Sequence, residues 1–149
     1  MASTARTALP PQLGVLLAGR GAVAGARVRT ALAARGLTMR SVFTLTHLAD
    51  GPVNQQALID LLGVDPSALV AVLNELEALG LLNRQRDTAD RRRHIVTITP
   101  EGIRTLADVD AILGGADDDL FAALSTEERR QLERLLEKVA DTDSCGDKY

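Results

Sequence analysis

The sequence predicts a mainly α-helical fold with one small β-hairpin, an α+β chain in which helices dominate. Apolar residues recur at helical spacing along most of residues 12–140, and residues typical of helix caps and turns separate these stretches. Between residues 81 and 99 the spacing changes to the alternation that is typical of strands. We therefore expect the hairpin to lie within a row of helices.

The first predicted helix covers residues 13–35. Its four glycines lower its intrinsic stability, so we expect this helix to need a packing partner. A second helix begins after Thr38, a residue favoured at N-caps, and ends before the breaker Asp50-Gly51-Pro52. Both helices are amphipathic, which is typical of helices packed on a core.

The third and fourth predicted helices are close together in sequence. Asn54 caps the third helix, which Gly63 ends, and Asp65-Pro66 begins the fourth with an N-cap followed by proline at the first helical position. Gly80 ends the fourth helix. Two helices joined by a tight turn that contains glycine form a helix-turn-helix. Their inward side chains are expected to be Ala57, Leu58, Leu61 and Leu62, then Leu69, Val72, Leu73, Leu76 and Leu79.

Two short strands follow, over residues 81–86 and 94–99. The polar segment between them is rich in arginine, the composition expected of a wing. Thr99-Pro100 begins another helix, in which Gly114-Gly115 predicts a kink or a break. Ser125 to Glu128 forms a capping box for a last helix, and the tail at 141–149 is expected to be flexible. The last helix carries Leu132, Leu135, Leu136 and Val139 on one stripe.

Length and composition indicate a chain with its own core, either one domain or one domain with an attached dimerisation element, because the chain has 149 residues and 46% of them are hydrophobic. No run of about eighteen apolar residues occurs, so we expect no membrane span. Residues 1–11 lack a basic segment followed by an apolar stretch, so we expect no secretory signal and a cytoplasmic protein. The single cysteine, Cys145, excludes an intrachain disulfide and a zinc site of several cysteines.

The net charge of −3 is distributed unevenly along the chain. Residues 1–50 carry +5 and residues 84–104 carry +3, whereas residues 51–83 carry −4 and residues 105–149 carry −7. A chain with this distribution can present a cationic face to phosphate while its remainder repels it. An ordinary solvated surface explains the clustering equally well.

Several segments together resemble the MarR family of regulators. They are Leu62-Gly-Val-Asp-Pro-Ser-Ala-Leu69, Leu76-Glu-Ala-Leu-Gly-Leu-Leu82, Arg84, Asp90-Arg-Arg92, Ile98-Thr-Pro-Glu-Gly102 and, near the C-terminus, Leu124-Ser-Thr-Glu-Glu-Arg-Arg-Gln-Leu132 with Leu135-Leu-Glu-Lys-Val139.

The resemblance covers residues 12–140 and implies a winged helix-turn-helix at 38–100 between dimerisation helices at 13–35 and 103–140. It implies a homodimer whose two lobes read a pseudo-palindromic operator in double-stranded DNA. The expected function is a sequence-specific transcriptional regulator, a repressor, that a small-molecule ligand releases from DNA.

Residues of the two central helices are expected to contact DNA. Ser67, together with Asn54, Gln55 and Gln56, offers hydroxyl, amide and N–H groups to phosphates. Asn74 is the best candidate for base reading, since its amide can pair with adenine, although a solvated side chain is equally consistent with the pattern. Many members of the family carry Thr and Arg on this face. Here Val70 and Ala71 stand instead, and we expect them to contact thymine methyl groups.

In the wing, Arg91, Arg92 and Arg93 are expected to reach phosphates or the minor groove. The Asp-x-Arg pattern of the family implies that Arg92 reads the minor groove. It also implies that the Asp90 carboxylate holds the wing, for which Arg84 is the proposed partner.

The resemblance further implies a small aromatic acid as ligand, in a crevice between the dimerisation helices and the DNA-binding lobe. Phe43 and His47 are the candidates to line it, with Arg20 or Arg27 to meet a carboxylate. The alternative is that these residues belong to the dimer core. Cys145 lies at the wrong end of the chain for an oxidant sensor near the N-terminus.

No catalytic arrangement is expected, so the chain is predicted not to be an enzyme and to bind no metal or cofactor. His47 and His94 are the only histidines, and Asp117 to Asp119 lack the spacing of a calcium loop. The competing class is a winged helix that binds proteins and no DNA. The acidic total and the Val70-Ala71 face favour that class, whereas the three consecutive wing arginines favour DNA.

Overall fold

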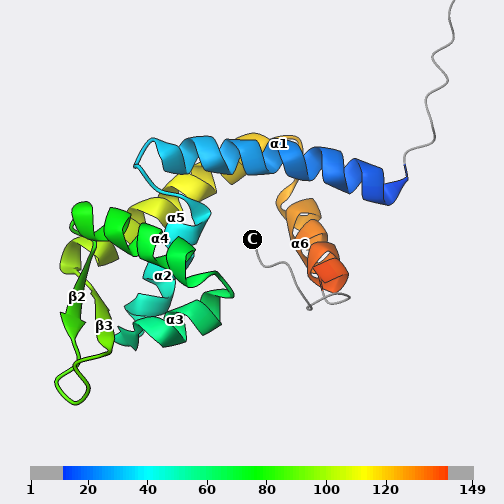
Figure 1. Ribbon diagram of the computed structural model, residues 1–149. Coiled ribbons are helices and arrows are strands. Elements are labelled where there is room, and N and C mark those ends of the chain that lie inside the picture. Colours follow the sequence, from blue (N-terminus) through cyan, green and yellow to red (C-terminus); the bar gives the residue numbers. More distant parts are fainter. Residues whose placement is uncertain (1–11, 141–149) are drawn as a thin grey trace, which may run out of the picture.

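The computed structural model describes residues 12–140, in which the central helices and a small sheet form one lobe and the first and last helices extend away from it (Figure 1). Over these residues the elements are α1 (Leu13–Ala33), α2 (Met39–Ala49), β1 (Val53–Asn54), α3 (Gln55–Leu62), α4 (Pro66–Ala78), β2 (Leu82–Arg86), β3 (His94–Ile98), α5 (Pro100–Leu120) and α6 (Thr126–Ala140).

The three strands form an antiparallel sheet in the order β1-β3-β2. Strands β2 and β3 are the expected hairpin, with Leu82 opposite Ile98 and Arg86 opposite His94. Strand β1 was not expected. It pairs Val53 with Val96, but two residues are too few to show an alternating pattern in the sequence.

The core lies where α2, α3 and α4 meet the sheet. Its leucines come from every one of these elements and have no exposed surface: Leu45, Leu48, Leu58, Leu69, Leu73, Leu76 and Leu82. Leu32 at the end of α1 and Val109 in α5 join the same core. A single core therefore fixes the two central helices and the hairpin relative to one another.

The predicted caps are present at most helix starts. The Thr38 hydroxyl accepts a bond from the Ser41 N–H, the Asn54 side chain accepts from the Gln56 N–H, and the Thr99 hydroxyl accepts from the Gly102 N–H. Asp65 occupies the N-cap of α4, but its side chain makes no capping bond. These bonds satisfy backbone donors that the first turn of a helix otherwise leaves unpaired.

Two leucines that were predicted to point inward are exposed. Leu61 is 51% exposed, because Leu58, Ile59 and Leu62 set the buried side of α3 and Leu61 lies on the neighbouring side. Leu79 is 47% exposed because it follows the last residue of α4, and the chain turns at Gly80 so that Leu81 is buried in its place.

The predicted break at Gly114-Gly115 is wrong, since α5 runs without interruption to Leu120, whereas a kink at this point stays a prediction. Each glycine costs a helix about 1 kcal/mol but keeps its backbone N–H, so the hydrogen-bonded ladder can continue. The packing of α5 offsets this cost, because Leu106, Val109 and Leu113 lie in or against the core.

Helices α1 and α6 extend away from the lobe (Figure 1). The Arg35 guanidinium at the end of α1 is 3.0 Å from the Asp108 carboxylate of α5. The remainder of α1 and all of α6 carry large apolar side chains that are mostly exposed, namely Leu13, Val15, Leu16, Leu17, Val23, Leu135, Leu136 and Val139.

No single helix among residues 12–140 is both long and apolar enough to cross a membrane. Helices α3 and α4 meet the criterion of length and composition only when taken together, across a bend of 112°. Cys145 and the predicted flexible tail lie outside the described residues.

Candidate nucleic-acid interface

Helices α3 and α4 have the geometry of a helix-turn-helix. They cross at 112° and are joined by Gly63, Val64 and Asp65. Gly63 adopts a left-handed backbone with φ of 60°, and its N–H bonds the carbonyl of Ile59 at 2.9 Å. A helix pair at 90–120° with a turn of three or four residues matches the arrangement that places the second helix in a major groove.

The outer face of α4 is made of residues spaced three and four apart. Ser67, Ala71 and Asn74 are exposed, and Val70 is 37% exposed. The opposite face of the helix is buried in the core through Leu69, Leu73 and Leu76. The first of these two faces is therefore the surface that α4 can present to a partner.

The three polar residues at the start of α3, Asn54, Gln55 and Gln56, differ in how accessible their side chains are. The Asn54 side-chain oxygen is 2.7 Å from the Gln56 N–H and is used to cap the helix. Gln56 is exposed, whereas Asn54 and Gln55 are half-buried. Gln56 is thus the most accessible of the three side chains.

Arg84 on β2 joins the hairpin to α4. Its Nε and Nη2 atoms lie 3.1 and 2.5 Å from Oε2 of Glu77, and its backbone N–H is 3.2 Å from Oε1. The same Nη2 atom is 2.6 Å from the side-chain oxygen of Asn74. Asn74, predicted to be a base reader or merely solvated, is therefore also part of a network with Arg84 and Glu77.

The network lowers the pKa of Glu77 below its ordinary value of 4.5. The side-chain hydrogen bond from Arg84 is the largest cause, its backbone N–H and its charge add to the effect, and burial opposes them. Glu77 is a residue that the sequence reasoning missed as part of the site. The helical spacing could have indicated it, because Glu77 lies three residues after Asn74 and therefore on a neighbouring part of the α4 surface.

The proposed pair between Asp90 and Arg84 is wrong. The Asp90 carboxylate is 3.4 Å from Nε of Arg93 and accepts a bond from the Arg92 N–H at 3.0 Å. Asp90 lies in the loop at the tip of the hairpin, while Arg84 is in the middle of β2 beside α4. The two side chains are therefore held by different neighbours.

The wing loop, residues 87–93, is organised by its own hydrogen bonds. The Asp87 N–H bonds the Arg93 carbonyl and the Arg93 N–H bonds the Asp90 carbonyl, both at 2.9 Å. The Asp87 carboxylate accepts from the Ala89 N–H at 2.9 Å. Within the described chain, Arg91 and Arg92 are exposed and neither forms an ion pair, so both can reach an external anion.

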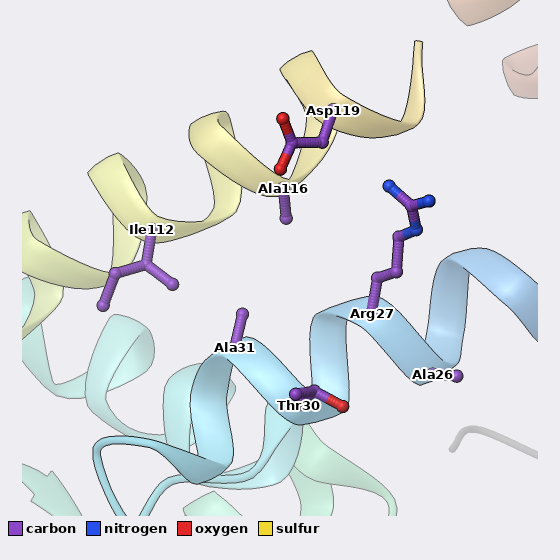
Figure 2. Close-up of a pocket in the computed structure, with 7 residues that line it drawn as sticks. All are labelled: Ala26, Arg27, Thr30, Ala31, Ile112, Ala116 and Asp119. Atoms are coloured by element: carbon purple, nitrogen blue, oxygen red, sulfur yellow. The ribbon is translucent and has the colours of Figure 1, made fainter. Parts of the chain in front are cut away.

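Most of the residues predicted to bind a ligand do not line the cavity that the structure has between α1 and α5. A cavity of about 460 Å³ lies between α1 and α5, and none of Arg20, Phe43 and His47 lines it. Arg27, the alternative cation, does line this cavity and extends from α1 toward the end of α5 (Figure 2). The other residues that line it are Ala26, Thr30, Ala31, Ile112, Ala116 and Asp119.

No group of three or more His, Cys, Asp or Glu side chains within residues 12–140 could hold a metal ion. In the acidic run of α5, the Asp118 carboxylate is 2.6 Å from the Arg129 guanidinium of α6. This run therefore contributes to the contact between α5 and α6.

A helix-turn-helix followed by an antiparallel hairpin with an arginine-bearing loop defines a winged helix-turn-helix protein. The model of the MarR family matches residues 35–93, which run from just before α2 through the helix-turn-helix to the end of the wing loop. The chain is 36% identical over 128 residues to a putative transcriptional regulatory protein for the hcr operon of Thauera aromatica, covering 84% of this chain and 77% of that protein. The chain belongs to the MarR family.

A second relative and two solved structures support the assignment to this family and its fold. An HTH-type transcriptional repressor of Mycobacterium tuberculosis is 31% identical over 128 residues, covering 85% of this chain and 92% of that one. The fold is similar to Bordetella bronchiseptica BpsR, whose DNA binding is described as regulated by 6-hydroxynicotinic acid, with a TM-score of 0.69, 27% identity and coverage of 89% and 95%. Escherichia coli MarR with operator DNA shares the fold, with a TM-score of 0.67, 24% identity and coverage of 86% and 93%. The two relatives are named as transcriptional regulators and not as enzymes.

Proposed function

We propose that this chain is a sequence-specific regulator that binds double-stranded DNA and represses transcription. One observation carries the proposal: a helix-turn-helix with an exposed outer face on α4 is combined with a wing whose Arg91 and Arg92 are exposed and free of ion pairs among the described residues. In such modules α4 enters a major groove, and the wing arginines reach phosphates or an adjacent minor groove.

The proposed contacts with DNA come from a small number of side chains on α3, α4 and the wing. Ser67 and the start of the helix can bind a phosphate, and Val70 with Ala71 can contact thymine methyl groups. Gln56 at the start of α3, with Asn54 and Gln55 behind it, offers further donors to phosphates. In the wing, Arg92 is the proposed minor-groove reader, and the Asp90 carboxylate stabilises the loop through Arg92 and Arg93.

We also propose that the regulator is a homodimer. Leu13 is 83% exposed and Val15 is 68% exposed on α1, and Val139 is 58% exposed on α6. So many large apolar side chains exposed on two helices are uncommon on a monomer, and a second copy of the chain would cover them. A two-fold axis between the copies would place two α4 helices on successive major grooves of a pseudo-palindrome.

A small aromatic acid is proposed to release the regulator from DNA. The similarity to BpsR supports this, because 6-hydroxynicotinic acid is described as regulating the DNA binding of that protein. The cavity between α1 and α5 has a volume of about 460 Å³, which falls in the range of small-molecule sites. Arg27 is positioned there to meet a carboxylate, while Arg20, Phe43 and His47 would need to reach a ligand from outside it.

Binding to fluorescent duplexes, beginning with DNA that flanks the chain's own gene, tests the proposal at two salt concentrations. Tight binding to a pseudo-palindrome that weakens steeply with salt supports a DNA regulator. Failure on every duplex at both salt concentrations contradicts it. That outcome would favour a winged helix that binds proteins, for which the apolar Val70-Ala71 face of α4 provides a surface.

A further inference from the structure

The side-chain amide of Asn74 is held in one orientation on the outer face of α4. Its oxygen lies 2.6 Å from Nη2 of Arg84. A guanidinium carries only N–H donors, so the amide atom that faces it must be the carbonyl oxygen. The amide nitrogen, on the other branch of the side chain, is therefore directed away from Arg84.

Arg84 is held by Glu77 independently of Asn74. Its Nε and Nη2 atoms both bond Oε2 of Glu77, and its backbone N–H bonds Oε1 of the same carboxylate. Only 22% of the Arg84 side chain is exposed. A guanidinium held by Glu77 at two atoms, with the backbone N–H of Arg84 bonded to the same carboxylate, provides a rigid reference for the Asn74 amide.

Asn74 is also the only amide side chain on α4, so its orientation bears directly on base readout. Its neighbours on the outer face, Val70 and Ala71, have no hydrogen-bonding groups. Pairing with adenine uses an amide oxygen to accept from N6 and an amide nitrogen to donate to N7. Guanine presents two acceptors, N7 and O6, and suits a group that offers donors alone.

We propose that Asn74 reads guanine by donating from its amide nitrogen to O6, the acceptor that adenine replaces with a donor, and that Arg84, anchored by Glu77, is the positioning residue that sets this preference. The inference rests on the proposed function and specifies the base that α4 recognises. It differs from the adenine contact expected from the sequence, because Arg84 already occupies one of the two lone pairs of the oxygen that would accept from adenine and directs the amide nitrogen outward.

The first experiment selects duplexes from a randomised library with the full-length wild-type chain and with Asn74→Ala. The wild type is expected to prefer guanine at one position of each half-site, and Asn74→Ala is expected to lose that preference. Asn83→Ala is the matched control. Asn83 alternates with Arg84 along β2 and is exposed on the other face of the sheet, so its removal should leave base preference unchanged.

The second experiment replaces that guanine with adenine, which carries a donor in place of O6, or with 7-deazaguanine, which keeps O6 and lacks N7, in the selected duplex. Adenine is expected to weaken wild-type binding about 5-fold, the worth of one hydrogen bond, whereas 7-deazaguanine should leave it within about 2-fold, and Asn74→Ala should change by less than about 2-fold with either base. If the wild type tolerates adenine, or if Asn74→Ala loses a preference for adenine, the inference is overturned.

Variants of the positioning network test the role of Arg84. Arg84→Lys keeps the positive charge but loses the planar fork, so the preference for guanine over adenine is expected to fall while salt-dependent binding to duplexes persists. Asn74→Asp provides a second measurement in case Arg84→Lys does not fold. It keeps a partner for Arg84 but has no donor, and it should lose the guanine preference without a lower melting temperature.

A retained guanine preference in Asn74→Asp, or in a folded Arg84→Lys, overturns the inference. A wild-type chain that binds no duplex overturns the proposed function as well, and the absence of salt-dependent binding identifies that outcome. Salt-dependent binding by the wild type with no guanine preference overturns the inference alone.

Discussion

Gly102, in the first turn of α5, packs against the backbone of Leu81 with no room for a side chain. A Cβ atom on Gly102 would lie 2.6 Å from Cγ1 of Ile98 and 3.2 Å from the carbonyl carbon of Leu81. Thr99 closes the same junction, because its N–H bonds the Leu81 carbonyl at 3.0 Å and its hydroxyl bonds the Gly80 carbonyl at 2.7 Å. The segment Ile98-Thr-Pro-Glu-Gly102 therefore fastens the hairpin to α5.

Gly102→Ala is expected to destabilise the protein, because the added methyl group must displace backbone. Overpacking of this kind costs about 2 kcal/mol. Gly114→Ala is the control, since nothing lies within 4 Å of a Cβ there and alanine should stabilise the helix by about 0.5–1 kcal/mol. Chemical denaturation of both variants measures the difference. Equal stability of the two variants would contradict the close packing at Gly102.

Local signals in the sequence predicted the fold well. Thr38, Asn54, Thr99 and the pair Ser125 and Glu128 mark helix starts in the structure as they do in the sequence. Capping residues act through hydrogen bonds to the next three residues, so their effect is encoded within a single turn. The element order of the winged helix-turn-helix followed from these signals and from the change of spacing at the hairpin.

Features that depend on distant packing were predicted less well. Leu61 and Leu79 are apolar and were expected in the core, but Leu61 lies beside the buried side of α3 and Leu79 follows the last residue of α4. The Gly114-Gly115 pair lowers helix propensity, and tertiary contacts of α5 outweigh that cost. Side-chain partners were the least predictable, because Arg84 can reach several acids and only the fold brings Glu77 beside it.

Arg92→Ala is expected to weaken operator binding by about 2 kcal/mol, roughly 30-fold, because a charge-assisted contact is lost. The slope of log K against log salt should become shallower by about one if the lost contact is to phosphate. Arg104→Ala is the control, since Arg104 is exposed on α5 and pairs with Glu101. Fluorescence anisotropy at several salt concentrations measures both quantities. An affinity unchanged from the wild type would remove Arg92 from the interface.

Val70→Ala is expected to change sequence preference more than overall affinity. Val70 is an exposed apolar residue on the outer face of α4, and its methyl groups can contact a thymine methyl group. Competition between duplexes that carry thymine or uracil at each position measures the loss of this methyl contact, since uracil lacks the methyl group. The wild type should discriminate at one position and Val70→Ala should not. Identical discrimination by both proteins would contradict the assignment.

The stabilising effect of Glu77 is expected to depend on pH. Its pKa is lowered in the folded chain by the hydrogen bonds and charge of Arg84, so it stabilises the fold fully above its ordinary pKa of 4.5. That stabilisation is lost as the pH falls through the lower, folded-state pKa. Because the Glu77–Arg84 pair is partly exposed, its contribution to the free energy of unfolding at pH 7 should be below about 1 kcal/mol.

Denaturation of wild type and Glu77→Gln between pH 7 and pH 3 tests this expectation. The wild type should be more stable at pH 7, and the difference should shrink as the pH falls below 4.5. Glu75→Gln, on the exposed side of the same helix, serves as the control for removing a charge from α4. A difference for Glu77→Gln that stays constant over this range would show that its ionised carboxylate contributes no stability.

Leu136→Glu is expected to dissociate the proposed homodimer. Leu136 lies on the apolar stripe of α6 and is 41% exposed in the single chain, so a second copy that covers it would have to bury the new carboxylate. Sedimentation at micromolar concentration should show a dimer for the wild type and a folded monomer for the variant. Gln131→Glu adds the same charge to α6 beside the stripe and should remain dimeric. If Leu136→Glu sediments as the wild type does, the stripe is not the dimer contact, and the two-lobed arrangement on a pseudo-palindrome needs another interface.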